Sequence, residues 1–147
     1  MKQRIVVDAP IEGLFQALIQ PAMEAYENVK KKAPTEEQLQ NGLSYQAPIA
    51  GSKPVKYATI KILKCEKPHV FSMEYTSSTF HKIDTMWLSS TDTGKVEIIT
   101  QHMEETIRNG QVIRSKGKED ADTIKSMSLM EMAKYRRLAS AVKKGLL

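Results

Sequence analysis

The chain has little that could fix a fold covalently or hold a metal. Its 147 residues include one cysteine, Cys65, and three histidines. A single cysteine excludes an intrachain disulfide, and the histidines share no helical spacing, so a metal site is not expected. A chain of this length can bury a core without disulfides or metals. The sequence therefore predicts a single domain over residues 1–147.

Long hydrophobic runs are also lacking. No run approaches the roughly 20 apolar residues that cross a bilayer, and the longest one near the start is Ile5-Val6-Val7. We therefore expect neither a membrane span nor a secretory signal. Hydrophobic residues make up 41% of the chain and charged residues 27%, which is ordinary for a globular protein in water. The sequence thus predicts a cytoplasmic protein.

The chain has no recognisable catalytic motif. Its glycines stand singly, mostly at turns, so no phosphate-binding loop forms and no nucleotide cofactor is expected. Cys65 and His69, four residues apart, are the one pair that resembles a nucleophile and a base. No helix N-terminus precedes Cys65, so a buried, inert thiol is the favoured interpretation. We expect no catalytic residue, no metal and no cofactor.

The net charge of +5 is concentrated toward the C-terminus. Residues 1–113 hold 13 basic and 13 acidic side chains, whereas residues 114–147 hold nine basic and four acidic ones. Acidic residues before a helix and lysines at its end complement its macrodipole, so a solvated basic face is the first interpretation. An acidic partner, such as lipid headgroups or another protein, is the second. Nucleic acid is not expected, because only Tyr135 is interleaved with these charges.

The first third of the chain predicts one strand followed by helices. Residues 2–9 alternate like a strand, which Pro10 ends. Apolar residues then recur at helical spacing, at Ile11, Leu14, Phe15, Leu18 and Ile19. Pro21 is expected to break or restart this helix, whose pattern resumes through residue 29. Thr35 begins one more short turn, which Asn41-Gly42 ends.

From Tyr45 onward the apolar period changes from about 3.6 residues to about 2, with a loop over residues 47–53. Strands are predicted at the ranges 55–65, 69–77, 80–90 and 95–108, joined by short turns that favour antiparallel neighbours. Asn109-Gly110 is a hairpin signal that adds a brief strand over 111–114, followed by a loop at 115–120. Residues 122–144, free of proline and glycine, predict a long helix with an apolar stripe that includes Met127 and Met130.

Several segments together resemble a known superfamily. They are Asp8-Ala9-Pro10, the following Ile11-Glu12-Gly13-Leu14-Phe15, the hairpin series and the apolar C-terminal helix. Their order is similar to that of START and polyketide-cyclase-like (SRPBCC) proteins with the helix-grip fold. The resemblance implies an α+β domain whose curved antiparallel sheet wraps around a long C-terminal helix over a hydrophobic cavity. Members bind lipids, sterols, polyketides or other apolar molecules, some are cyclases, and some modulate other proteins.

Three further segments narrow the resemblance. They are Leu39-Gln40-Asn41-Gly42-Leu43-Ser44-Tyr45, the strand pair around Thr93-Gly94-Lys95, and Gln101-His102-Met103-Glu104-Glu105. They look like an uncharacterised domain-of-unknown-function family of Gram-positive bacteria in the same superfamily. This resemblance carries over no catalytic residues.

Side-chain alternation predicts which residues face the cavity. If Met86 and Ile98 point inward from neighbouring strands, then Asp84, Thr100 and His102 lie on the same face. The cavity is then apolar at one end and polar at the other, which suits an amphipathic small molecule. The candidate ligand-binding residues are Phe71, Met73, Tyr75, Asp84, Met86, Leu88, Ile98, Thr100, His102, Met127 and Met130.

The sequence leaves three functions open. The favoured one is a non-catalytic binding domain for an apolar or amphipathic small molecule. If the polar strand residues only face water, the domain is instead a protein-interaction or regulatory domain without a ligand. If His102 and Asp84 form a general acid/base pair, it is a cyclase-type enzyme. Trp87 alternates with Met86 and Leu88 along its strand, so it lies on the outer face of the sheet if those two side chains point inward. An exposed tryptophan there would mark a contact surface, and a homodimer through this face is one possibility.

Overall fold

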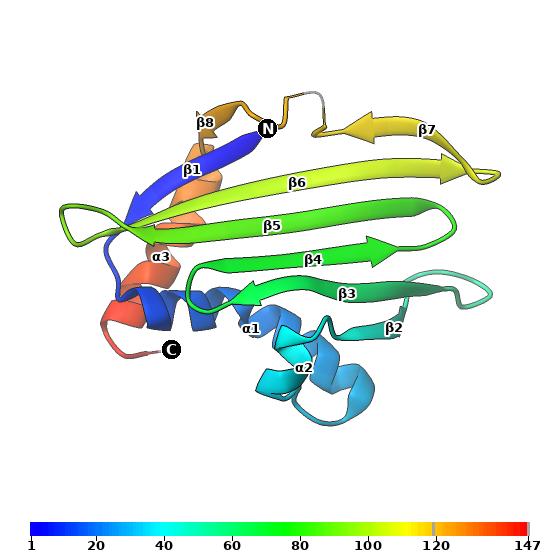
Figure 1. Cartoon of the computed structure of the whole chain (residues 1–147), viewed down its shortest axis with the longest axis horizontal. Helices are drawn as coiled ribbons and strands as arrows, with labels where there is room; N and C mark the ends of the chain where they lie inside the picture. The colour runs from blue at the N-terminus through cyan, green and yellow to red at the C-terminus, as the bar shows by residue number, and fades with distance from the viewer. Residues whose placement is uncertain (119, 147) are drawn as a thin grey trace.

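The computed structural model describes residues 1–118 and 120–146 (Figure 1). Along the chain the elements are β1 (Lys2–Val7), α1 (Ile11–Lys30), α2 (Glu36–Gln40), β2 (Ser44–Pro48), β3 (Tyr57–Glu66), β4 (Val70–Thr76), β5 (Phe80–Ser90), β6 (Val96–Arg108), β7 (Gln111–Lys116), β8 (Ile124–Ser126) and α3 (Leu129–Lys143). No helix among the described residues is both long enough and apolar enough to span a bilayer.

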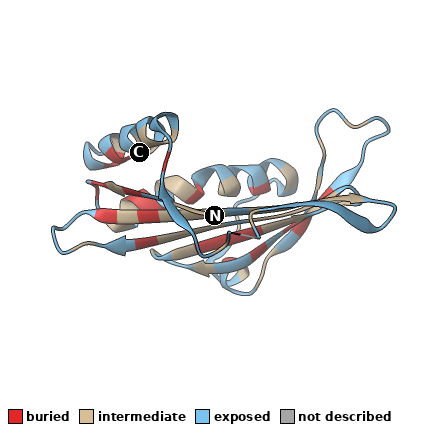
Figure 2. Ribbon diagram, turned by 90° about the horizontal axis from the view of Figure 1, so that it is seen from above, coloured by how far each residue is buried: buried red, intermediate tan, exposed pale blue. Residues whose placement is uncertain are grey.

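One curved sheet holds all the strands. Its order is β2-β3-β4-β5-β6-β1-β8, and β7 pairs with the far half of β6. Thus β1 runs beside residues 96–101 of β6 and β7 beside residues 104–108. Both α1 and α3 lie on one face of the sheet, here called the inner face (Figure 2), and the opposite face is called the outer face. The expected α+β class, with a mainly antiparallel sheet and a C-terminal helix, is confirmed.

Helix α1 does not break at Pro21, contrary to the expectation from the sequence. It continues from Ile11 to Lys30 with Pro21 inside it. Proline removes one backbone hydrogen bond from a helix, but Ile19 before it and Tyr26 after it are both buried. Packing of both halves onto the sheet therefore outweighs the lost bond.

The connection from α1 to the sheet is partly as predicted. Thr35 caps α2 through a reciprocal capping box with Gln38, as its sequence indicates. Strand β2 is a correction, because the sequence assigned residues from 47 onward to a loop. Ser44–Pro48 pairs with β3, with Tyr45 opposite Ile60, and Pro48 is tolerated because β2 is an edge strand.

The C-terminal helix starts later than predicted. Residues 124–126 form β8, which pairs in parallel with β1, and the helix begins at Leu129. Ser128 caps it by accepting a hydrogen bond from the Glu131 backbone N–H at 3.3 Å. The sequence pattern alone could not show that β1 offers a free edge to these residues. Strand β7 also extends to Lys116, two residues beyond the predicted end.

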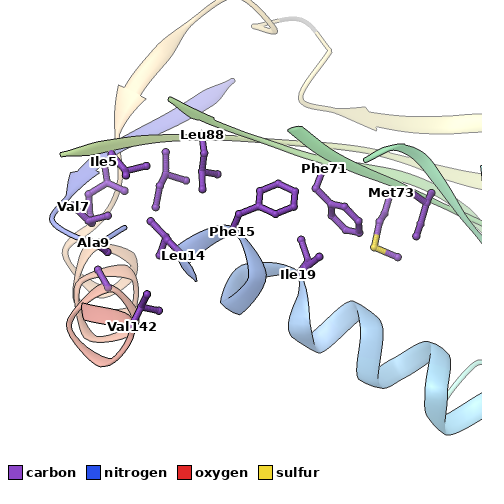
Figure 3. Close-up of a cluster of buried hydrophobic side chains, with 14 of the residues drawn as sticks. Ile5, Val7, Ala9, Leu14, Phe15, Ile19, Phe71, Met73, Leu88 and Val142 are labelled. Carbon is purple, nitrogen blue, oxygen red and sulfur yellow. The ribbon is translucent and has the colours of Figure 1, made fainter. Parts of the chain in front are cut away.

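The core lies between α1, α3 and the inner face. Figure 3 shows Leu14, Phe15 and Ile19 of α1 pointing toward the sheet, where Phe71 and Met73 meet them. The Phe15 and Phe71 rings pack edge to face, with centroids 6.5 Å apart. Helix α3 approaches α1 closely at Gly13, where a Cβ atom would stand 2.9 Å from Val142 Cγ1. The core therefore fills one end of the inner face and holds α3 against α1.

Candidate functional site

An open cavity of about 1280 Å³ occupies the rest of the inner face. Its floor is formed by β1 and by strands β2 to β7, and its walls by α1 and α3. Beyond Phe15 and Ile19, the side chains that α1 presents to this space are mostly small. They are Ala17, Leu18, Pro21, Ala22 and Ala25. The cavity exists because these residues leave unfilled the space that larger side chains fill in the core.

The structure brings seven of the eleven predicted site residues together around this cavity. They are Phe71, Met73, Tyr75, Asp84, Met86, Thr100 and His102. The antiparallel register explains this, since Asp84 stands opposite both Met73 and His102, and Met86 opposite both Phe71 and Thr100. Alternation then places all of these side chains on the inner face.

The other four predicted residues do not line the cavity. Leu88, Ile98 and Met127 are buried in the core, each at most 3% exposed. Met130 is 84% exposed, so its assignment to the cavity is wrong. The reason is the late start of α3, which puts Met130 in the first helical turn and turns its side chain to solvent.

The cavity also has lining residues that the sequence did not indicate. Strands β2 and β3 contribute Tyr45 and Ile60, and α3 contributes Tyr135 and Arg137, among others. Tyr45 and Ala47 alternate as strand residues do, which is a signal that could have identified Tyr45. Predicting the α3 residues requires the rotation of this helix about its own axis, which its partial apolar stripe does not fix.

The polar end of the cavity is centred on His102. Its Nδ1 contacts an Asp84 carboxylate oxygen, and its Nε2 lies 3.1 Å from Glu104 Oε2. Partial burial lowers the pKa of His102, but the hydrogen bonds to Asp84 and Glu104 outweigh this effect, so the pKa is raised overall. An imidazolium that donates from both nitrogens has no lone pair with which to accept a proton. This geometry favours a positioning role over a general base.

Two phenols lie near this polar end. Burial raises the pKa of Tyr75, and the negative charge of Asp84 adds to the effect. Burial likewise raises the pKa of Tyr135, with contributions from Glu131 and then Asp84. Both hydroxyls therefore stay protonated at neutral pH and can donate hydrogen bonds.

The Cys65 and His69 pair does not form a catalytic arrangement. Burial raises the pKa of the Cys65 thiol despite the nearby Lys67 ammonium, so little thiolate is present at neutral pH. His69 Nδ1 lies 3.0 Å from the Leu88 carbonyl oxygen, to which it can donate. Neither residue lines the cavity described above.

The outer face of the sheet carries polar clusters as well as Trp87. The Lys2 ammonium lies 5.1 Å from the centroid of the Trp87 ring. His81 sits between two carboxylates, with Nε2 2.9 Å from Glu74 Oε2 and Nδ1 3.1 Å from Glu105 Oε1. Self-association through this face stays a prediction.

The His81 cluster is expected to make the stability of the protein depend on pH. Hydrogen bonds to Glu74 and then Glu105 raise the pKa of His81, despite some opposing effect of burial. The stabilisation by the imidazolium is complete below the ordinary histidine pKa of about 6.5 and is lost as the pH rises through the raised value. We expect a higher melting temperature at about pH 6 than at about pH 8.5, and a smaller difference in His81→Asn. An equal difference in the variant and the wild type would contradict this.

The fold and the cavity define an α+β domain of the helix-grip kind, with an open cavity between the sheet and two helices. The chain belongs to the family described as Domain of unknown function (DUF3284), whose family model matches residues 1–118. The expected membership of a domain-of-unknown-function family is thereby confirmed. No curated protein sequence matches the chain.

Solved structures of similar shape come from several bacteria. A conserved protein from Geobacillus kaustophilus is 9% identical, with a TM-score of 0.44, over 98% of this chain and 89% of that one. The Zhui aromatase/cyclase from Streptomyces sp. R1128 is 14% identical, with a TM-score of 0.47, over 99% of this chain and 84% of that one. A protein from Chromobacterium violaceum is 14% identical, with a TM-score of 0.43, over 97% of this chain and 96% of that one.

Proposed function

We propose that the domain binds an amphipathic small molecule in the cavity without transforming it. The observation that carries this proposal is the cavity of about 1280 Å³, whose lining changes from apolar to polar along its length. The apolar part lies between Phe71, Met73 and Met86 of the sheet and the small residues of α1. Ligand pockets commonly measure about 300–1,000 Å³ and have mostly apolar linings with a few polar groups, so this cavity is large enough to hold a small molecule.

The polar end favours a negatively charged head on the bound molecule. Lys116, Lys134 and Arg137 line this end, and among the described residues none of them takes part in an ion pair. The nearby carboxylates of Asp84 and Glu104 are already paired with His102. Two more carboxylates line the cavity: Asp120 pairs with the N-terminal amine, and Glu131 is in no ion pair among the described residues. Three free cations against one free carboxylate leave this end net positive, which suits a carboxylate or a similar anion on the ligand.

Titration calorimetry with palmitate tests this proposal. The double variant Lys134→Ala/Arg137→Ala is expected to bind palmitate about tenfold more weakly, because two cations facing the head are lost. Binding of methyl palmitate, which has no charge, is expected to stay unchanged.

The same helix offers a matched control. Arg136→Ala/Lys144→Ala removes the same two charges from exposed positions of α3 and its cap that do not line the cavity. It is expected to bind palmitate like the wild type. Equal losses in the two double variants would show that long-range charge, and not the mouth of the cavity, attracts the anion.

A further inference from the structure

We propose that His102 determines the charge preference of the cavity, because its imidazolium neutralises the Asp84 carboxylate and so allows the polar end to accept an anionic head. This inference rests on the proposed function and adds a specificity-determining residue and a dependence on pH. When the imidazolium loses its proton, the same cavity is expected to bind anions more weakly and cations more tightly.

Both ring nitrogens of His102 face carboxylates. Nδ1 contacts an Asp84 carboxylate oxygen, and Nε2 lies 3.1 Å from Glu104 Oε2. A neutral imidazole has one N–H and one lone pair, so it can donate to only one of two carboxylates, and its lone pair then faces the other. An imidazolium donates to both. The arrangement therefore fits the protonated ring, which agrees with the raised pKa of His102.

Asp84 depends on His102 more than Glu104 does. In the sheet, the cross-strand neighbours of Asp84 are an uncharged residue on β4 and His102 on β6. Glu104 instead stands between Lys82 on β5 and Lys116 on β7. The hydrogen bond from His102 lowers the pKa of Glu104 most, and against the opposing effect of burial Lys82 and then Lys116 lower it further. Loss of the His102 proton thus leaves Asp84 without a cation across the strands, whereas Glu104 keeps two.

The Asp84 charge is accessible to a molecule in the cavity. Asp84 and His102 both line the cavity, and their side chains are 51% and 44% exposed. A carboxylate on the wall that has lost its cation repels an anionic head and attracts a cationic one. Since both side chains are about half in water, screening keeps this effect moderate.

Other charged and titratable groups lie around this end of the cavity. They are Lys82, Lys116, Asp120, the N-terminal amine, Glu131, Lys134 and Arg137, with the phenols Tyr75 and Tyr135. With Asp84, Glu104 and protonated His102, the described residues give six positive and four negative groups. A neutral His102 therefore halves the positive excess. The N-terminal amine also titrates at about pH 8, so variants of His102 are needed to separate the two groups.

Calorimetric titration with decyl sulfate and decyltrimethylammonium tests this proposal, because both heads keep their charge at every pH used. The wild type is expected to prefer the anion at about pH 6. The ratio of the two dissociation constants is expected to shift about fivefold toward the cation by about pH 9. In His102→Gln, the shift is expected to be present at the lower pH already, with little further change at the higher one. The ratio does not depend on the fraction of folded protein.

Two further variants serve as rescue and control. Asp84→Asn/His102→Gln also removes the carboxylate that His102 neutralises, so it is expected to return the ratio to the wild-type value at about pH 6. His81→Gln is the matched control, since His81 likewise lies between two carboxylates but on the outer face. It is expected to show the ratio and the pH dependence of the wild type.

Three results would overturn the proposal. The first is a wild-type ratio and pH dependence in His102→Gln, and the second is an equal loss of affinity for both ligands in that variant, which would indicate a structural role. The third is a failure of the double variant to restore the anion preference. If neither ligand binds the wild type, and palmitate does not bind either, the proposed function itself fails, which is distinct from binding without a charge preference.

Discussion

Replacing Phe15 by alanine is expected to lower the free energy of unfolding by about 3–5 kcal/mol, the range for removing a fully buried aromatic ring. Phe15 is 1% exposed and packs edge to face on Phe71. It also closes the core next to the cavity, so its loss leaves a void that α1 cannot easily fill. Urea denaturation followed by circular dichroism measures the change.

Phe80→Ala provides the comparison for this prediction. Phe80 begins β5, is half-buried, and has the Lys82 ammonium 4.9 Å from its ring centroid. Its loss is expected to cost less than about 2 kcal/mol, because part of the ring is already in water. Similar losses for the two variants would show that the core does not depend on the contact between α1 and the sheet.

Replacing Ala22 by phenylalanine is expected to weaken palmitate binding by about a hundredfold, because a ring at this position takes the space of the ligand chain. Ala22 lies on the face of α1 that lines the cavity. Since the ring enters open space, the free energy of unfolding is expected to stay the same or to rise. Calorimetry and urea denaturation of the same preparation measure both quantities.

The control for this variant is Ala133→Phe, which adds the same ring to an exposed position of α3 outside the cavity lining. It is expected to bind palmitate like the wild type. Unimpaired binding by Ala22→Phe would place the ligand somewhere other than the cavity.

Local patterns predicted most of the fold. The alternation over residues 55–108 predicted β3 to β6, and the helical spacing from Ile11 predicted α1. The errors occurred where distant partners decide the structure. Pro21 stays within a helix because both halves pack on the sheet, and residues 124–126 form a strand because β1 offers them an edge.

Alternation also predicted much of the cavity floor, because period-2 patterns fix which side chains share a sheet face. It placed Asp84, Thr100 and His102 on one face, where they line the cavity. It could not predict the walls, since the rotation of α1 and α3 depends on tertiary packing. For the same reason it included Met130, which faces solvent. It also missed Tyr45, because no strand was predicted over residues 44–48.

Comparison of native and denaturing mass spectra of the purified protein tests the central claim most directly. The account predicts that the native spectrum contains a species heavier than the chain, that denaturation releases the additional mass, and that organic extracts contain an amphipathic molecule. It also predicts that Ala22→Phe, purified in the same way, lacks this species. Native spectra that show the bare chain alone, in a protein that also fails to bind palmitate, would contradict the claim that the cavity is a ligand-binding site.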